Sequence, residues 1–291
     1  MEILIIGGEG QLGTSLSNLV SKETFANFTV TKIEDLDLSK EENIKSYFES
    51  KDFNYIINCT AYTAVDNAES DHDTARLINA RAVQWIGRHA HNIGAKVIHI
   101  STDYVYDGEN NRPITTKELI NPTSTYGRTK AEGEQLLVQE NRDSIIIRTS
   151  WLYSEYGNNF VKTMLKLGSE RDELKVVYDQ IGTPTYAEDL ALAIIHILKR
   201  AKEDEAKFIP GTYHFSNEGV CSWYDFAKMI FKLSDINIYV EPVFSNEFPT
   251  VAKRPHYSVL DKSKIKNNFG ITIPFWVDSL EKCLKNINNI N

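Results

Sequence analysis

The chain opens with an apolar run, a glycine-rich turn and an amphipathic segment in immediate succession. Residues 3–6 are all Ile or Leu, as expected for a strand buried on both faces. Gly7, Gly10 and Gly13 follow at a spacing that lets backbone amides and a helix N-terminus approach a pyrophosphate. The stretch therefore predicts a parallel α/β sheet that binds a dinucleotide. The alternative is a tight strand-to-helix turn without a ligand.

The same alternation continues through the first half of the chain. Further buried strands are expected at residues 28–33, 55–58, 96–100 and 144–148. Helical patterns separate them, including one continuous helix over 72–92 that carries Asn79 and another that Ser39 and Glu42 would cap. Strands and helices in alternation predict a doubly wound, Rossmann-like parallel sheet.

The pattern changes after residue 150, where aromatic and amide side chains lie among turn residues. We expect residues 1–150 to form the NAD(P)-binding domain and residues 151–291 to form mainly a smaller α/β substrate-binding domain. The segment 187–215 is expected to pack back on the first domain.

A tyrosine and a lysine lie one helical turn apart near the start of a predicted helix. If Tyr126 opens that helix, Lys130 lies on the same face. A fixed ammonium favours phenolate, so we expect Lys130 to lower the pKa of Tyr126. Thr102 adds a hydroxyl at the carboxyl end of a strand. Together these groups suit hydrogen bonding to a carbonyl oxygen while hydride reaches its carbon.

The end of the second predicted strand bears on the choice between NAD and NADP. An acid there would favour NAD through the ribose 2′-hydroxyl. This chain has Lys32 at that position, with Asp35 and Asp37 a little downstream. The pattern leaves the choice open, and Lys32 predicts that NADPH is used at least as well as NADH.

Composition excludes several classes of protein. A net charge of −8 provides no basic field for nucleic acid, and no segment approaches membrane-spanning length. Three scattered cysteines and the absence of a secretory signal predict a cytoplasmic protein without disulfides. The seven histidines show no metal-ligand spacing, so no metal is expected.

Eight segments taken together resemble the extended short-chain dehydrogenase/reductase family, and the resemblance covers the whole chain. Several of them, notably RTSW, GNNF and DQ-G-PT, are narrower than the general signature of that family. The matching segments are residues 7–13, 58–69 (NCTAYTAVDNAE), 101–108 (STDYVYDG), 126–130, 148–153 (RTSWLY), 157–164 (GNNFVKTM), 179–185 (DQIGTPT) and 254–260 (RPHYSVL).

The resemblance implies an oxidoreductase of dTDP-rhamnose biosynthesis that reduces the C4 keto group of a nucleotide-linked deoxysugar. The implied substrate is dTDP-4-dehydro-L-rhamnose, and the implied hydride donor is NADPH or NADH. Tyr126 would supply the proton, Thr102 would hydrogen-bond the carbonyl oxygen, and Lys130 would bind the nicotinamide ribose. The cofactor residues, from motif positions and resemblance together, are Gly7, Gly10, Gln11, Leu12, Gly13, Lys32, Asp37, Leu38, Thr60, Ala61, Tyr62 and Lys130. The substrate residues are Val65, Asp66, Thr102, Asp103, Trp151, Asn159 and Arg254.

Several alternatives stay open at this point. Another nucleotide-sugar epimerase, reductase or dehydratase of the family is one, although the dehydratases follow the threonine with Asp-Glu and here Tyr104 follows Asp103. A non-catalytic, NADP-binding regulatory subunit resembling that of methionine adenosyltransferase is another. Trp151 alternatively belongs to the core, and Arg254 to a solvated surface pair. The resemblance also allows a homodimer, but Ser15 replaces a glutamate linked in some relatives to a metal-bridged dimer, so that metal is not transferred.

Overall fold

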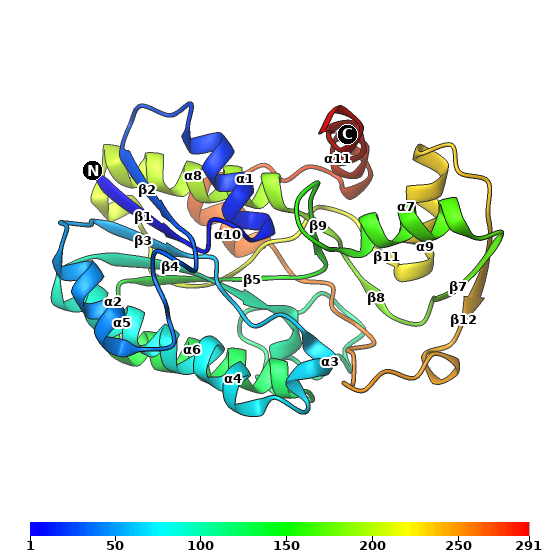
Figure 1. Ribbon diagram of the computed structural model, residues 1–291, viewed down its shortest axis with the longest axis horizontal. Coiled ribbons are helices and arrows are strands. Elements are labelled where there is room, and N and C mark those ends of the chain that lie inside the picture. Colours follow the sequence, from blue (N-terminus) through cyan, green and yellow to red (C-terminus); the bar gives the residue numbers. More distant parts are fainter. Residues whose placement is uncertain (291) are drawn as a thin grey trace.

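The computed structural model describes residues 1–290 and is built around a six-stranded sheet (Figure 1). All of its strand pairs are parallel, in the order β10-β5-β4-β3-β1-β2. The predicted doubly wound α/β fold is confirmed. The strands are β1 (Glu2–Ile6), β2 (Asn27–Thr31), β3 (Tyr55–Asn58), β4 (Lys96–Thr102), β5 (Ser144–Thr149) and β10 (Gly211–His214).

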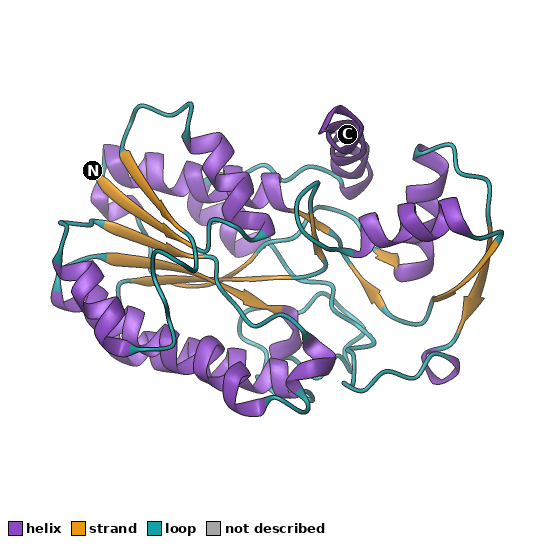
Figure 2. Cartoon of the chain, viewed as in Figure 1, coloured by secondary structure: helices purple, strands orange, loops and turns teal. Residues whose placement is uncertain are grey.

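Helices cover both faces of this sheet (Figure 2). On one face lie α1 (Gln11–Val20), α8 (Ala187–Glu203) and α10 (Ser263–Phe269); on the other lie α2 (Glu41–Glu49), α5 (Ala82–Asn92) and α6 (Thr125–Glu140). Successive side chains of a strand point to opposite faces. Ile3 and Ile5 therefore enter the core under α1 and α8, whereas Leu4 and Ile6 enter the core under α2 and α5. Burial on both faces explains why the first strand is apolar at every position.

Two local predictions on the second face are wrong. The helix expected over 72–92 is interrupted: α4 (His72–Arg76) passes through a π-helical turn, Leu77–Arg81, before α5 begins. Ser39 does not cap α2, which begins after Lys40 without a side-chain cap. The backbone N–H of Ser39 instead donates to Asp37 Oδ1 at 2.9 Å, so this residue belongs to a turn.

A second hydrophobic core lies beyond the carboxyl ends of the strands, to the right in Figure 1. There α7 (Phe160–Glu170) and α9 (Trp223–Leu233) pack on the parallel pair β7 (Glu173–Val177) and β12 (Tyr239–Val243). The final helix, α11 (Trp276–Ile290), supplies further residues to this core. The amphipathic stripe of α9 faces inward through Phe226, Ile230 and Phe231.

The two cores do not divide at a single point in the chain. Helix α8 packs against α1, and β10 extends the main sheet beside β5. Helix α10 also packs on the first core, although it lies far into the second half of the sequence. The short elements are α3 (Val65–Ala68), β6 (Leu152–Tyr153), β8 (Ile181–Gly182), β9 (Thr185–Tyr186), β11 (Cys221–Ser222) and 3₁₀ turns at Asp103–Val105, Glu205–Lys207 and Ser245–Glu247. Within residues 1–290, no helix has the length and apolarity needed to cross a membrane.

Candidate active site

The glycine turn lies where the strand order reverses, since β1 is flanked by β2 on one side and β3 on the other. Ligands of open α/β sheets bind at such a switch point, outside the carboxyl ends of the strands. A Cβ at Gly13 would lie 2.0 Å from the Gly7 carbonyl oxygen, so a side chain cannot fit. A Cβ at Gly10 would meet only the Gly7 carbonyl oxygen, at 3.6 Å. Because α1 also begins without a side-chain cap, its first N–H groups are available to an anion.

The end of β2 is more acidic than the sequence pattern suggested. Lys32 is exposed and its Nζ lies 3.8 Å from Glu34. Glu9, in the glycine turn, accepts a hydrogen bond from the backbone N–H of Ile33 at 3.2 Å. Glu9 was not predicted from the sequence, because its position in the motif tolerates any residue. Of the other predicted cofactor residues here, the Asp37 carboxylate binds Ser39 N–H and the Leu38 side chain is buried in the core.

Thr102, Tyr126 and Lys130 are brought together by β4 and α6. Thr102 is the last residue of β4, is buried, and lies in register with Thr149 of β5. Tyr126 is the second residue of α6 and is 9% exposed, whereas Lys130 is 1% exposed. Ser124 caps α6 by accepting a hydrogen bond from the N–H of residue 127. The expected one-turn spacing on one helix is therefore present.

The expected effect of Lys130 on Tyr126 is not found. Burial raises the pKa of Tyr126, opposed by a hydrogen bond with Thr102 and reinforced by the carboxylate of Asp103. Lys130 Nζ is instead held by the Ile100 carbonyl oxygen at 2.7 Å and by His99 Nε2 at 3.2 Å. The prediction that Lys130 lowers the pKa of Tyr126 is wrong for this arrangement, since desolvation dominates.

Contacts from three other segments hold α6 in place. A Cβ at Gly127 would lie 2.2 Å from the Tyr104 carbonyl oxygen, so glycine is required for the helix to approach that turn. Glu69 accepts hydrogen bonds from the backbone N–H and the hydroxyl of Thr125, at 2.6 and 2.9 Å. Asn79, in the π turn, donates to Thr129 Oγ1 at 3.1 Å. The sequence did not reveal the partners of these residues.

Asn79 also positions the loop that follows β3. Its side chain accepts from Tyr62 N–H at 2.9 Å and donates to the Tyr62 carbonyl oxygen at 3.2 Å. The Thr60 hydroxyl donates to Asn58 Oδ1 at 2.6 Å. Thr60, Ala61 and Tyr62 are all partly exposed at the carboxyl end of β3, next to the glycine turn. A flat ring could therefore lie against this stretch of backbone.

Asp103 is buried beside Thr102 with one oxygen unpaired. It is 2% exposed, and its Oδ1 accepts from the Thr102 hydroxyl at 3.1 Å. Its Oδ2 is buried and has no hydrogen-bond partner. Burial raises the pKa of Asp103 to about 6, against the opposing effects of the nearby Ser258 hydroxyl, which forms no hydrogen bond of ordinary length with Oδ2, and of the Thr102 hydroxyl. A buried polar atom without a partner is costly, and this one lies next to the predicted reacting groups.

Asp66 and Arg254, which lie far apart in the sequence, form an ion pair. Asp66 Oδ2 accepts from Arg254 Nη2 at 2.9 Å, and Arg254 Nη1 donates to the Tyr104 hydroxyl at 3.3 Å. Asp66 Oδ1 also accepts from Ala252 N–H at 3.0 Å. Val65 packs with Tyr104 against the cluster that contains Tyr126. Arg254 is therefore paired and partly buried, not a freely solvated cation.

Trp151 follows β5 in a backbone conformation that a bulky residue rarely adopts. Its φ is +49°, and its ring stacks on Trp223 with centroids 3.7 Å apart and planes 12° apart. Strained conformations of this kind cluster at functional sites, where surrounding contacts hold them. Trp151 packs against the second core through one face, so the core and substrate interpretations are compatible.

Three predicted residues, Asn159, Gln11 and Leu12, have side chains occupied by contacts within the protein. Asn159 caps α7, and its Nδ2 donates to Gln11 Oε1 at 2.9 Å and to the Ser154 carbonyl oxygen at 2.7 Å. These bonds engage both polar atoms of Asn159, so the substrate role predicted for it is not supported. The Gln11 side chain turns toward the second half of the chain, and Leu12 is buried in the first core. Gln11 and Leu12 can offer a cofactor only their backbone.

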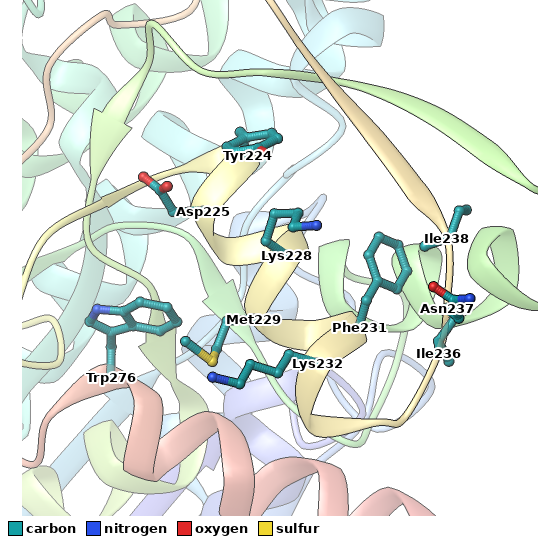
Figure 3. Close-up of a pocket in the computed structure, with 10 residues that line it drawn as sticks. All are labelled: Tyr224, Asp225, Lys228, Met229, Phe231, Lys232, Ile236, Asn237, Ile238 and Trp276. Atoms are coloured by element: carbon teal, nitrogen blue, oxygen red, sulfur yellow. The ribbon is translucent and has the colours of Figure 1, made fainter.

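A cavity of about 890 Å³ opens between α7, β7 and the loop that carries Arg254. Its walls include Phe160, Met164 and Trp223, and Arg254 lies at its polar side. A different pocket, on the outer side of α9, contains none of the predicted site residues and is not assigned to the active site. Figure 3 shows that pocket, with Tyr224, Lys228 and Lys232 projecting from α9 and Trp276 from α11.

No metal site is found in the part of the chain that the structure describes: no three His, Cys, Asp or Glu side chains there are placed to share an ion. Ser15 is buried, and its hydroxyl donates to the Gln11 carbonyl oxygen at 2.9 Å within α1.

Comparison with known proteins identifies the family. The sequence model of the family described as "RmlD substrate binding domain" matches residues 1–289. A dTDP-4-dehydrorhamnose reductase of Aggregatibacter actinomycetemcomitans is 41% identical, over 98% of this chain and 97% of its own. The crystal structure of a dTDP-4-dehydrorhamnose reductase from Clostridium acetobutylicum has a TM-score of 0.93 at 42% identity, covering 99% of this chain and 100% of its own. The enzyme of that name from Bacillus anthracis, solved in complex with NADP, has a TM-score of 0.91 at 36% identity, over 98% and 99% of the two chains. The chain therefore belongs to the dTDP-4-dehydrorhamnose reductase family, within the extended short-chain dehydrogenases/reductases.

Proposed function

We propose that this chain reduces the C4 keto group of dTDP-4-dehydro-L-rhamnose, giving dTDP-L-rhamnose, with NADPH or NADH as the hydride donor. The observation that supports the reaction is the placement of Thr102, Tyr126 and Lys130 at the carboxyl edge of the sheet. The substrate follows from the names of the relatives, and NADP from the complex with the Bacillus anthracis enzyme.

The residues around the glycine turn fit a dinucleotide. The uncapped start of α1 and the open backbone at Gly10 would hold the pyrophosphate. The backbone from Thr60 to Tyr62 would lie along the adenosine side, and Lys130 would reach the nicotinamide ribose. When bound, the cofactor supplies the hydride.

Tyr126 acts as the general acid. Because burial raises its pKa, the phenol keeps its proton at neutral pH, which is the form that a proton donor needs. The Thr102 hydroxyl, which donates to Asp103 Oδ1 in the ligand-free structure, would rotate to donate to the carbonyl oxygen and help to orient it. The unpaired Oδ2 of Asp103 is available to accept a hydrogen bond from a sugar hydroxyl next to the reacting carbon.

The nucleotide part of the substrate lies in the cavity between α7, β7 and the loop that carries Arg254. Phe160 and Trp223 offer flat apolar walls for a base, and Arg254 offers a guanidinium for the diphosphate. Trp151 stacks on Trp223, which lines this cavity, and provides a wall for the deoxysugar. Asp66 holds the Arg254 guanidinium, and Val65 packs beside Tyr104 near Tyr126. Asn159 acts only through Gln11.

The cysteines bear on the location of the protein in the cell. Cys59, Cys221 and Cys283 are all free thiols, which supports a reducing cytoplasmic location. Association as a homodimer stays a prediction, and sedimentation of the purified protein would test it.

Oxidation of NADPH on addition of each member of a panel of nucleotide-linked keto sugars tests the reaction. We expect loss of NADPH absorbance with the dTDP-linked 4-keto deoxysugar and formation of the corresponding alcohol. An epimerase would convert a sugar without net consumption of cofactor, and a regulatory subunit would bind NADPH without consuming it. Absence of NADPH oxidation with every keto sugar of the panel would overturn the proposal.

A further inference from the structure

The amine of Lys130 lies against a buried histidine on the neighbouring strand. His99, on β4, is fully buried, and its Nε2 lies 3.2 Å from Lys130 Nζ. Its other ring nitrogen, Nδ1, lies 3.1 Å from Asn58 Nδ2, on β3. Lys130 Nζ also donates a hydrogen bond to the Ile100 carbonyl oxygen at 2.7 Å. The amide, the imidazole and the amine thus form one chain of contacts.

The orientation of the Asn58 amide is fixed by its other partner. The backbone N–H of Thr60 lies 3.0 Å from Asn58 Oδ1, and a backbone N–H can only donate. The atom that faces Thr60 is therefore the amide oxygen, and the NH₂ group faces His99. Nδ1 of His99 must then accept a hydrogen bond, which places the single proton of the neutral imidazole on Nε2.

The proton on His99 Nε2 faces Lys130 Nζ and disfavours an ammonium group at that position. The N–H of His99 Nε2 points at Lys130 Nζ, and an ammonium has three donors but no lone pair. A neutral amine satisfies every contact, because its lone pair accepts from His99 while one of its hydrogens binds the Ile100 carbonyl oxygen. We propose that His99, oriented by Asn58, is a positioning residue that favours the neutral amine form of Lys130 over its ammonium form when the site contains no ligand.

The other charged groups near Lys130 do not reverse this conclusion. Glu134, one turn further along α6, favours the ammonium, but it is already paired with Arg148 of β5 through a bond from Nε to Oε1 of 2.9 Å. Burial lowers the pKa of Lys130 to about 8 despite Glu134. Burial and Lys130 together hold the pKa of His99 well below its ordinary value, so the imidazole is neutral. Tyr126, one turn earlier on α6, is uncharged at neutral pH because burial raises its pKa.

Nuclear magnetic resonance of the ligand-free protein tests the arrangement directly. In protein labelled with ¹⁵N-histidine, His99 should show a protonated Nε2 and an unprotonated Nδ1, with its signals assigned by their loss in His99→Phe. The ¹³Cε signal of Lys130 should titrate at least one pH unit below the ordinary lysine pKa of about 10.4. A proton on Nδ1, or titration at the ordinary value, would overturn the inference. Neither measurement depends on catalysis, so its outcome is separable from that of the proposed function.

Asn58→Asp reverses the contact at nearly constant shape. The carboxylate keeps an acceptor for Thr60 and replaces the NH₂ group with a second acceptor, which draws the imidazole proton to Nδ1. Nε2 then accepts from Lys130, and the Lys130 titration should move up by at least one pH unit. The added charge alone also raises that pKa, so the matched control is Asn58→Asp in the His99→Phe background. An equal shift in both backgrounds would mean that charge, not the tautomer, is responsible, and would refute the role of His99.

The consequence for catalysis rests on the proposed function. If the ammonium form of Lys130 is the reactive form, the alkaline limb of kcat/KM, which reports groups of the free enzyme, should move in Asn58→Asp by the same number of pH units as the ¹³Cε titration. A shift in the titration with no shift in kcat/KM would separate the protonation state of Lys130 from the reaction. If Asn58→Asp fails to fold, as judged by thermal unfolding, the tautomer of His99 in the unmodified protein decides the question.

Discussion

Arg254 allows the proposed substrate contact to be separated from its structural contact. In the ligand-free structure its guanidinium pairs with Asp66 at 2.9 Å, and the two side chains are 30% and 38% exposed. Pairs this exposed contribute roughly 0.2–1 kcal/mol to stability, because water screens them. Arg254→Ala should therefore lower the melting temperature by only a few degrees, since about 1 kcal/mol corresponds to about 2–4 °C in a chain of this size.

The effect on ligand binding should be larger. A charge-assisted hydrogen bond to a diphosphate is worth about 1.5–3 kcal/mol, from which the loss of the Asp66 pair must be subtracted. The net change of about 1–2 kcal/mol corresponds to a roughly 5- to 30-fold rise in Kd. Calorimetric titration with dTDP, which contains the diphosphate without the keto deoxyhexose, measures this quantity directly. The Kd of NADPH should stay within about twofold of its starting value, because Arg254 lies outside the glycine-turn region.

Lys253→Ala is the matched control. Lys253 carries the same charge, is adjacent in the chain and pairs with the exposed Glu109 at 3.5 Å. The Lys253→Ala variant should lose little dTDP affinity. An equal loss in both variants would mean that Arg254 affects dTDP binding only through the net charge of the protein and not through a direct contact. If Arg254→Ala lost NADPH affinity and kept dTDP affinity, Arg254 would belong to the cofactor-binding part of the site and not to the part that binds the nucleotide sugar.

Three further predictions follow from the site. Tyr126→Phe should lower kcat by about 10²–10⁴-fold with the Kd of NADPH unchanged, because only the transferable proton is lost; turnover within a few-fold of the original would remove Tyr126 from the mechanism. Glu9→Gln should lower the Kd of NADPH about threefold and leave the Kd of NADH unchanged in a fluorescence titration. The substitution removes one negative charge near the expected position of the NADPH 2′-phosphate but keeps an acceptor for the N–H of Ile33. Equal changes for both cofactors would contradict this. Asp103→Asn should lose activity, and its stability relative to the original chain should rise with pH. In the original chain the folded pKa of Asp103, about 6, lies above the usual 3.8, so the protonated carboxyl stabilises the fold fully below about pH 4. The original chain loses this stabilisation as the pH rises through about 6, whereas the neutral amide does not titrate. At pH 8 the Asp103→Asn variant should therefore be more stable than the original chain by on the order of 3 kcal/mol. A stability difference that becomes less favourable to the variant between pH 5 and pH 8 would refute the assignment.

The sequence was most informative where one residue type has one structural use. Continuous apolar runs predicted the buried strands, because a parallel strand covered on both faces has no polar positions. The glycine spacing predicted the turn after β1, since a side chain at Gly13 has no room. The pair Tyr126 and Lys130 could be placed on one face of a helix from their separation alone.

Contacts between distant segments could not be read in this way. The interrupted helix at Leu77–Arg81 has the same apolar pattern as a continuous one, because a single π turn shifts the register only once. Lys130 was expected to act on Tyr126, but its actual partner, His99, lies 31 residues earlier in the chain on a different element. Serine is a residue type that often caps helices, but Ser39 lies in a turn formed with Asp37. Composition identifies which residues can make such bonds, whereas tertiary packing decides which bonds form.

Three departures from ordinary local structure lie at or next to the proposed site. The backbone of Trp151 is left-handed, the helix around Asn79 contains a π turn, and Asp103 Oδ2 is buried without a partner. Each of these features costs free energy that ordinary packing would avoid, by about 1–3 kcal/mol for a strained backbone or an unpaired buried polar atom. Such costs are expected where function requires a particular geometry. The same kinds of feature also occur at Asp235, whose φ is +55°, and at the buried, unpaired Tyr153 hydroxyl, so the three around Thr102 and Tyr126 agree with the proposed site but do not define it alone.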